Sequence, residues 1–122
     1  MNLKKAIRYV MTITFPLIGI MHFTNPSPFL AIIPSGLPWP LALIYISGLF
    51  EILFGIGLIT KYRKHAAYGL ILLLIAVFPA NIYLAISSIA QETFGTSQTI
   101  AVTRLPFQFL FIWMAYSQTK DD

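Results

Sequence analysis

Side chains that could bind a ligand interrupt the long apolar stretches of this sequence at widely separated positions. They are His22, Ser47, Glu51, Asn81, Arg104 and Gln108. A charged side chain in an apolar segment costs about 3 kcal/mol on membrane-insertion scales, and such residues usually mark a binding site or an ion pathway. We therefore take these six residues as the candidate ligand-binding set.

Two interpretations of this set stay open. In the first, Glu51 and Arg104 form a buried ion pair, the amide and imidazole groups satisfy the remaining donors and acceptors, and the set only stabilises the fold. In the second, the set lines a polar pocket for a small ligand. Asn81 would then be buried, and His22 would lie at the mouth, where water solvates it.

The sequence contains no motif of self-contained catalytic chemistry. It has no Gly-rich phosphate loop, no HExxH zinc motif, no GxSxG nucleophile motif and no EF-hand pattern. Its two histidines, His22 and His65, fall at opposite ends of the apolar segments, so they do not share a metal ion. We expect no metal site, and the sequence leaves open whether the protein is an enzyme.

The amino-acid composition indicates whether the chain folds in water or in a membrane. Of the 122 residues, 57% are hydrophobic and only 10% are charged, and none is cysteine. Soluble domains carry about 25% charged residues, and disordered chains are polar and poor in aromatic residues. The absence of cysteine excludes disulfides and thiol chemistry by the chain itself. The composition therefore predicts an integral membrane protein.

Four apolar segments are long enough to cross a bilayer, which takes about 20 residues per helix. They cover residues 7–23, 39–59, 66–89 and 99–117. We predict an all-α fold in which four transmembrane helices form an antiparallel four-helix bundle, as a single domain over residues 1–122. The connection 24–38 carries an apolar run too short to span, which favours an interfacial or re-entrant cap over the pocket; a surface loop on lipid is the alternative.

The basic residues predict the orientation of this bundle. Seven of the eight lie before or at the start of the first segment, between the second and third segments, or after the fourth, namely Lys4, Lys5, Arg8, Lys61, Arg63, Lys64 and Lys120. With four spans, all seven lie on one side. The positive-inside rule then puts both termini in the cytoplasm, for a multi-pass protein of the cell (inner) membrane. No basic stripe interleaves with aromatic residues, so we expect no nucleic-acid partner.

Small residues accompany the acidic residue of the second segment. Ser47, Gly48 and Gly55 share one helical face with Glu51, and small side chains let a neighbouring backbone come close. Prolines lie near the polar positions of the other three segments: Pro16, Pro79 and Pro106. Each proline removes one backbone donor, and we expect the helices to be wider apart there.

The same positions carry a family resemblance. Residues 19–26, 47–55, 76–81 and 104–108 together resemble the DoxX-like family of small bacterial membrane proteins. The resemblance implies a four-helix membrane fold. Members of that family have been linked to membrane redox complexes, including quinone-coupled sulfur oxidation, and others to roles in assembly.

The resemblance implies an accessory subunit of a membrane redox system, with a quinone or lipid-like ligand and a membrane or peripheral redox partner protein. Since the chain has no cysteine, a partner, a bound quinone or another cofactor would carry the electrons. A different class of function is a non-catalytic assembly or chaperone-like membrane protein, in which the polar set only stabilises the bundle. A third is a small-molecule transporter, which would need a homo-oligomer because four spans enclose a narrow pathway.

Overall fold

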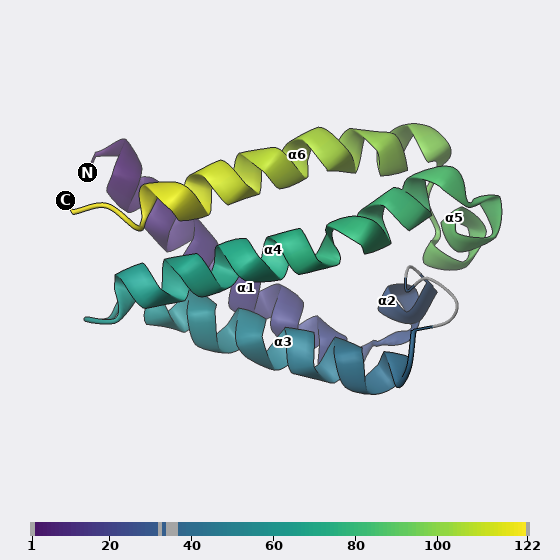
Figure 1. Cartoon of the computed structure of the whole chain (residues 1–122), viewed down its shortest axis with the longest axis horizontal. Helices are drawn as coiled ribbons and strands as arrows, with labels where there is room; N and C mark the ends of the chain where they lie inside the picture. The colour runs from purple at the N-terminus through teal and green to yellow at the C-terminus, as the bar shows by residue number, and fades with distance from the viewer. Residues whose placement is uncertain (1, 32, 34–36, 122) are drawn as a thin grey trace.

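The computed structural model describes residues 2–31, 33 and 37–121, and these residues form helices and no strand. The helices are α1 (Leu3–Thr24), α2 (Ser27–Ala31), α3 (Pro40–Gly57), α4 (Arg63–Ile86), α5 (Ser88–Phe94) and α6 (Gln98–Ser117). The four long helices, α1, α3, α4 and α6, run along the length of the molecule (Figure 1). Both chain termini lie at one end, which we call the terminal end, and α2 and α5 lie at the other (Figure 1).

Local signals in the sequence explain where several of these helices begin. The side chain of Asn2 accepts a hydrogen bond from the backbone N–H of Lys5 at the start of α1, and Ser97 does the same for Ile100 at the start of α6. Both are N-cap residues that satisfy a donor without a partner inside the helix. Helix α3 begins with Pro40, whose missing N–H costs nothing in the first turn.

Three of the helices are long and apolar enough to cross a membrane. They are α1, α3 and α4, and only 22% of the most apolar window of each is buried inside the protein. The remaining surface is rich in large apolar side chains, such as Leu72 at 68% exposed and Ile75 at 54%. Such a surface suits lipid rather than water, so the chain is a helical membrane protein. Helix α6 is 20 residues long but does not reach the same hydropathy, so its crossing stays a prediction.

The connection between α4 and α6 differs from the expectation. The third apolar segment was expected to run to residue 89, but α4 ends at Ile86 and a separate helix, α5, follows after Ser87. The Ser87 side chain caps α5 by accepting from the N–H of Ala90, and Gly95 ends it in the left-handed region at φ 86°. The residues between the third and fourth predicted segments, 90–98, are therefore helical up to Phe94.

The connection between α1 and α3 contains the short helix α2, which packs against α5 and α3. The expected role of this connection as an interfacial or re-entrant cap stays a prediction. Ile32 and residues 34–36 of this connection, and the two terminal residues of the predicted domain, lie outside the described residues.

Helices α1 and α3 pack closely because glycines line their contact. A Cβ atom added at Gly48 would lie 2.7 Å from the Cβ of His22, and one added at Gly19 would lie 2.5 Å from the backbone oxygen of Gly48. Gly55 accommodates the ring of Pro16 in the same way. The small residues predicted beside the acidic position therefore set the distance between these two helices.

The segment after α6 ties the terminal end together. Gln118 is fully buried; its amide nitrogen donates to the Lys4 carbonyl at 3.0 Å, and its side-chain oxygen accepts from Arg8 at 2.9 Å. Arg63 of α4 donates to the Gln118 carbonyl at 3.2 Å. At the end of this segment, Asp121 forms an ion pair with Lys64, and this pair holds the pKa of the Asp121 carboxyl below its usual range. This segment, which we call the tail clasp (Gln118–Asp121), joins α6 to α1 and α4.

Candidate functional site

A cavity of about 390 Å³ lies among the four long helices and is bounded by α2 as well. Its lining residues are Thr14, Phe15, Ile18, His22, Phe29, Glu51, Leu74, Val77, Asn81, Arg104, Phe107, Gln108 and Phe111. Five of the six candidate residues line this cavity, and they come from α1, α3, α4 and α6. Ser47 is half-buried and is not among the lining residues.

Glu51 is the buried acidic residue of this cavity. Glu51 is only 8% exposed, and its Oε2 atom has no hydrogen-bond partner in the described structure. Its position follows from the small residues around it, because Gly48 and Gly55 on the same face allow α1 to pack directly against α3. A buried carboxylate oxygen without a donor loses the hydrogen bonds that water would give it. This oxygen is therefore the atom of the cavity that most needs a donor.

His22 lies beside Glu51 but does not hydrogen-bond to it. Its Nδ1 atom is 2.7 Å from the carbonyl oxygen of Ile18, which can only accept, so Nδ1 carries the proton and donates there. The distance from Nδ1 to Oε2 of Glu51 is 3.8 Å, which is too long for a hydrogen bond. The imidazole also stacks on the ring of Phe29 from α2, with centroids 3.9 Å apart.

The expectation that water solvates His22 at the pocket mouth is wrong. The residue is 6% exposed, because α2 covers it with Phe29 and α3 packs against it at Gly48. The stack with Phe29 was not predicted. The apolar run 29–33 pointed to a cap, but no pattern in the sequence indicates which side chain of a five-residue helix faces inward.

The two amide side chains bridge α4 and α6. Asn81 donates a hydrogen bond to the side-chain oxygen of Gln108, and Gln108 donates to the backbone oxygen of Leu74. That oxygen lies next to the carbonyl of Ile75, whose helical donor is missing because Pro79 has no N–H. The amide pair is thus largely satisfied within the protein, and it holds the two helices together beside the cavity.

Arg104 contacts an aromatic ring instead of an acid. Its guanidinium carbon lies 4.8 Å from the centre of the Phe94 ring in α5, a distance typical of a cation–π interaction. Among the described residues it has no ion pair and no hydrogen bond from its side chain. The contact depends on helix α5, which ends at Phe94 and which the sequence did not predict.

Glu51 and Arg104 therefore do not make the expected ion pair directly, within the part of the chain that the structure describes. Both residues line the same cavity, but the nearest charged or titratable partner of Glu51 is His22. The cavity accordingly contains one acidic and one basic side chain, and neither has a charged hydrogen-bond partner among the residues that the structure describes. A ligand that supplies both a donor and an acceptor would satisfy them together.

The other walls of the cavity are apolar, and one of them reaches the outer surface. Phe107 and Phe111 of α6 line the cavity and are 52% and 37% exposed. The cavity wall on this side is thus one aromatic layer thick. A volume of about 390 Å³ is within the range of small-molecule sites, which combine apolar walls with a few polar groups. No group of three or more acidic or histidine residues that could hold a metal ion occurs among the described residues.

Comparison with known proteins gives one match. No curated protein sequence and no solved structure matches this chain. Residues 11–119, which include every residue that lines the cavity, match a family described as "Domain of unknown function (DUF8561)". Because this match covers most of the sequence, the chain belongs to that family of unknown function.

Proposed function

We propose that this protein binds a small amphipathic molecule in a pocket between its transmembrane helices. The observation that carries the proposal is the buried Oε2 atom of Glu51, which lacks a hydrogen-bond partner among the described residues and belongs to a residue lining a cavity of about 390 Å³. A residue with only a structural role would be expected to have its charge satisfied by the protein.

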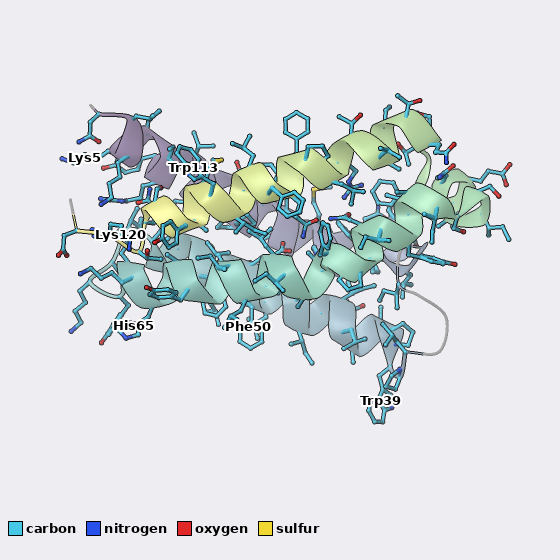
Figure 2. The ribbon with its side chains drawn as sticks, turned by 45° about the horizontal axis from the view of Figure 1, so that its top comes forward. Lys5, Trp39, Phe50, His65, Trp113 and Lys120 are labelled. Atoms are coloured by element: carbon cyan, nitrogen blue, oxygen red, sulfur yellow. The ribbon has the colours of Figure 1, made fainter. Side chains whose placement is uncertain are left out.

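The proposal includes a fourth crossing by α6 and a defined orientation. Lys5, His65 and Lys120 project at the terminal end, whereas Trp39 projects from the opposite end (Figure 2). Positive residues favour the cytoplasmic side of a membrane, and tryptophan favours the interface. We therefore place both termini in the cytoplasm, four antiparallel helices across the inner membrane, and the α2 and α5 helices on the outer side.

The resemblance to the DoxX-like family makes a quinone one candidate occupant and an accessory role in a membrane redox system one candidate role. Oxidised quinones carry two carbonyl groups, which accept hydrogen bonds. Such groups suit the guanidinium of Arg104, but they offer no donor to an ionised Glu51. A reduced quinol, whose hydroxyl groups donate, fits both residues better.

The rival function is a membrane assembly protein in which the same residues only hold the helices together. The Asn81–Gln108 bridge between α4 and α6 favours such a structural role for the two amides. It does not extend to Glu51, whose Oε2 atom makes no contact of this kind in the described structure.

The two functions differ in what the purified protein retains. We would purify the protein in a mild detergent, extract it with organic solvent and identify the extracted molecules by mass spectrometry. The matched variants are Glu51→Gln, in the cavity, and Glu92→Gln, which makes the same chemical change on the exposed face of α5.

We expect one molecule in near-stoichiometric amount from the wild type and from Glu92→Gln, and much less from Glu51→Gln. Equal amounts of every extracted molecule from all three proteins would favour the assembly function. A quinone in the extract would support the redox role, and a molecule of another class would support binding without that role.

A further inference from the structure

The chemistry of the cavity restricts its ligand further than size and apolar walls do. Two charged side chains line it, Glu51 and Arg104, and they do not pair with each other within the described residues. Among these residues, the Glu51 oxygen lacks a hydrogen-bond donor, and the Arg104 guanidinium lacks a hydrogen-bond acceptor. A complementary ligand has both groups, and it restores the charge balance of the site if the donor is cationic and the acceptor is anionic.

We propose that the cavity takes a zwitterionic group, in which a primary ammonium faces Glu51 and a phosphate or carboxylate faces Arg104. This inference rests on the proposed function, because it names the ligand class of the same pocket. The donor must bear a polar hydrogen, since Oε2 of Glu51 is buried without a hydrogen-bond partner in the described structure, and a primary ammonium supplies such a hydrogen together with a positive charge. A quaternary ammonium carries charge but has no N–H to donate, so it satisfies the charge and leaves the oxygen unbonded.

The neighbouring residues do not compete for these two roles. The N–H of His22 is committed to the Ile18 carbonyl at 2.7 Å. The amide groups of Asn81 and Gln108 bond to each other and to the Leu74 carbonyl. Among titratable groups, the cavity therefore offers the Glu51 carboxyl, the Arg104 guanidinium and the second nitrogen of the His22 ring.

The location of the aromatic wall decides how a lipid would fit. Phe107 and Phe111 line the cavity and are also exposed on the outer face of α6. The acyl chains of a phospholipid with an ethanolamine headgroup would leave the cavity along these two rings and enter the surrounding bilayer. A free zwitterion of the same chemistry, such as phosphoethanolamine or an amino acid, would occupy the cavity without touching that exit.

The test compares three lipids that differ only in their headgroup. Dioleoyl phosphatidylethanolamine has a primary ammonium and a phosphate, the phosphatidylcholine has a quaternary ammonium, and the phosphatidylglycerol has no cation. We would add each in turn to delipidated protein and measure retention by native mass spectrometry and stabilisation by thermal unfolding. A hydrogen bond to a charged group is worth a factor of about ten or more in affinity. We therefore expect phosphatidylethanolamine to bind at least about tenfold more tightly than the other two.

Variants test whether the preference for the ethanolamine lipid depends on Glu51 and Arg104. Glu51→Gln and Arg104→Gln should each remove most of the preference for the ethanolamine lipid, and Glu92→Gln should keep it. Phe107→Ala tests the source of the ligand: it should weaken lipid binding if acyl chains leave along α6. An equal effect of this substitution on the binding of the lipid and of free phosphoethanolamine, tested in parallel, would identify the free zwitterion as the ligand.

The wild-type comparison alone overturns the inference if the three lipids bind equally and phosphoethanolamine has no effect, so the outcome does not depend on a variant that folds poorly. The quinone probe decylubiquinone separates this failure from failure of the proposed function. If decylubiquinone binds the wild type and Glu92→Gln but not Glu51→Gln, the pocket function stands and the zwitterionic class is wrong. If neither the lipids, phosphoethanolamine nor decylubiquinone binds, both proposals fail.

Discussion

At the scale of single residues, the site is built from charges that face a shared space rather than each other. The carboxylate of Glu51 is held next to His22, at 3.8 Å from its ring nitrogen, while Arg104 lies over Phe94. In a ligand-free protein, two charged residues without a shared partner have little direct influence on each other's contribution to stability.

This arrangement predicts the outcome of a double-mutant cycle on Glu51→Gln and Arg104→Met. In delipidated protein, we expect the two losses in unfolding free energy to be coupled by less than about 1 kcal/mol, because the side chains line one cavity but do not touch. With a bound ligand that contacts both, the coupling should grow. The measurement is reversible unfolding in mixed detergent, with and without dioleoyl phosphatidylethanolamine. A coupling above about 1 kcal/mol without ligand would mean that the two residues form a direct ion pair.

Most residues of the candidate set could be predicted from the sequence, because a polar side chain in an apolar helix has few favourable directions. That argument brings His22, Glu51, Asn81 and Gln108 to the interior, and all four line the cavity. It also brings Arg104 to the cavity, but it does not predict the partner of Arg104, because the long stem can carry the guanidinium in several directions. The argument fails for Ser47, a small residue at the margin of the predicted face, which does not line the cavity.

At the scale of elements, the glycine contact between α1 and α3 positions the acidic end of the site. His22 packs against Gly48, one turn before Glu51 on α3. Any change that moves α1 away from α3 therefore moves the imidazole away from the carboxylate. Glycines at such contacts are needed for close approach rather than for backbone freedom.

Two alanine substitutions distinguish the effect of disturbing this helix contact from the general effect of replacing a glycine. Gly48→Ala places a Cβ atom 2.7 Å from the Cβ of His22 and 2.8 Å from the Gly19 carbonyl, atoms close to or in the α1 backbone. Gly69→Ala places one 2.6 Å from the ring end of Phe54, which can swing aside. We expect Gly48→Ala to cost about 1–3 kcal/mol and Gly69→Ala clearly less.

The measurement is thermal unfolding of both variants in the same detergent, together with ligand retention. Gly48→Ala should also reduce retention, because it displaces His22 from the cavity wall. Equal destabilisation by the two substitutions would show that the α1–α3 distance is not set by the glycine contact.

The elements themselves were predictable to different degrees. Apolar length predicts α1, α3 and α4 well, because each remains apolar on average over the thickness of a bilayer despite a few polar residues. It cannot locate the break at Ser87, since the apolar residues Ile86 and Ile89 continue on both sides of it. The cap signals, Ser87 before α5 and Gly95 after it, are present in the sequence and would have identified α5 if read as helix boundaries.

At the scale of the whole molecule, the structure puts the two termini at one end (Figure 1). The loop between α3 and α4 ends there too, since Arg63 at the start of α4 contacts the tail clasp. This placement requires that α6 run the length of the molecule, whatever its own hydropathy. The orientation in the membrane then depends on which end carries the basic residues.

Introduced thiols test this orientation directly, because the chain has no cysteine of its own. We expect Lys61→Cys and Lys120→Cys to react with a membrane-impermeant maleimide only after the membrane is opened. Thr93→Cys and Thr99→Cys should react in intact cells. Lys120→Cys and Thr99→Cys lie at the two ends of α6, so the same access for both would mean that α6 does not cross the membrane.

The tail clasp joins the two ends of the chain, so it forms only after the other helices have been synthesised. Its bond between Gln118 and Lys4 joins residues 114 positions apart, whereas the α1–α3 contact joins neighbouring long helices. During synthesis, α1, α3 and α4 are therefore available to pack before α6 and the clasp have emerged. For that interval Glu51 faces a space without the wall formed by Arg104, Phe107 and Gln108. A ligand taken up from the surrounding lipid at this stage would gain its contact with Arg104 only when α6 docks.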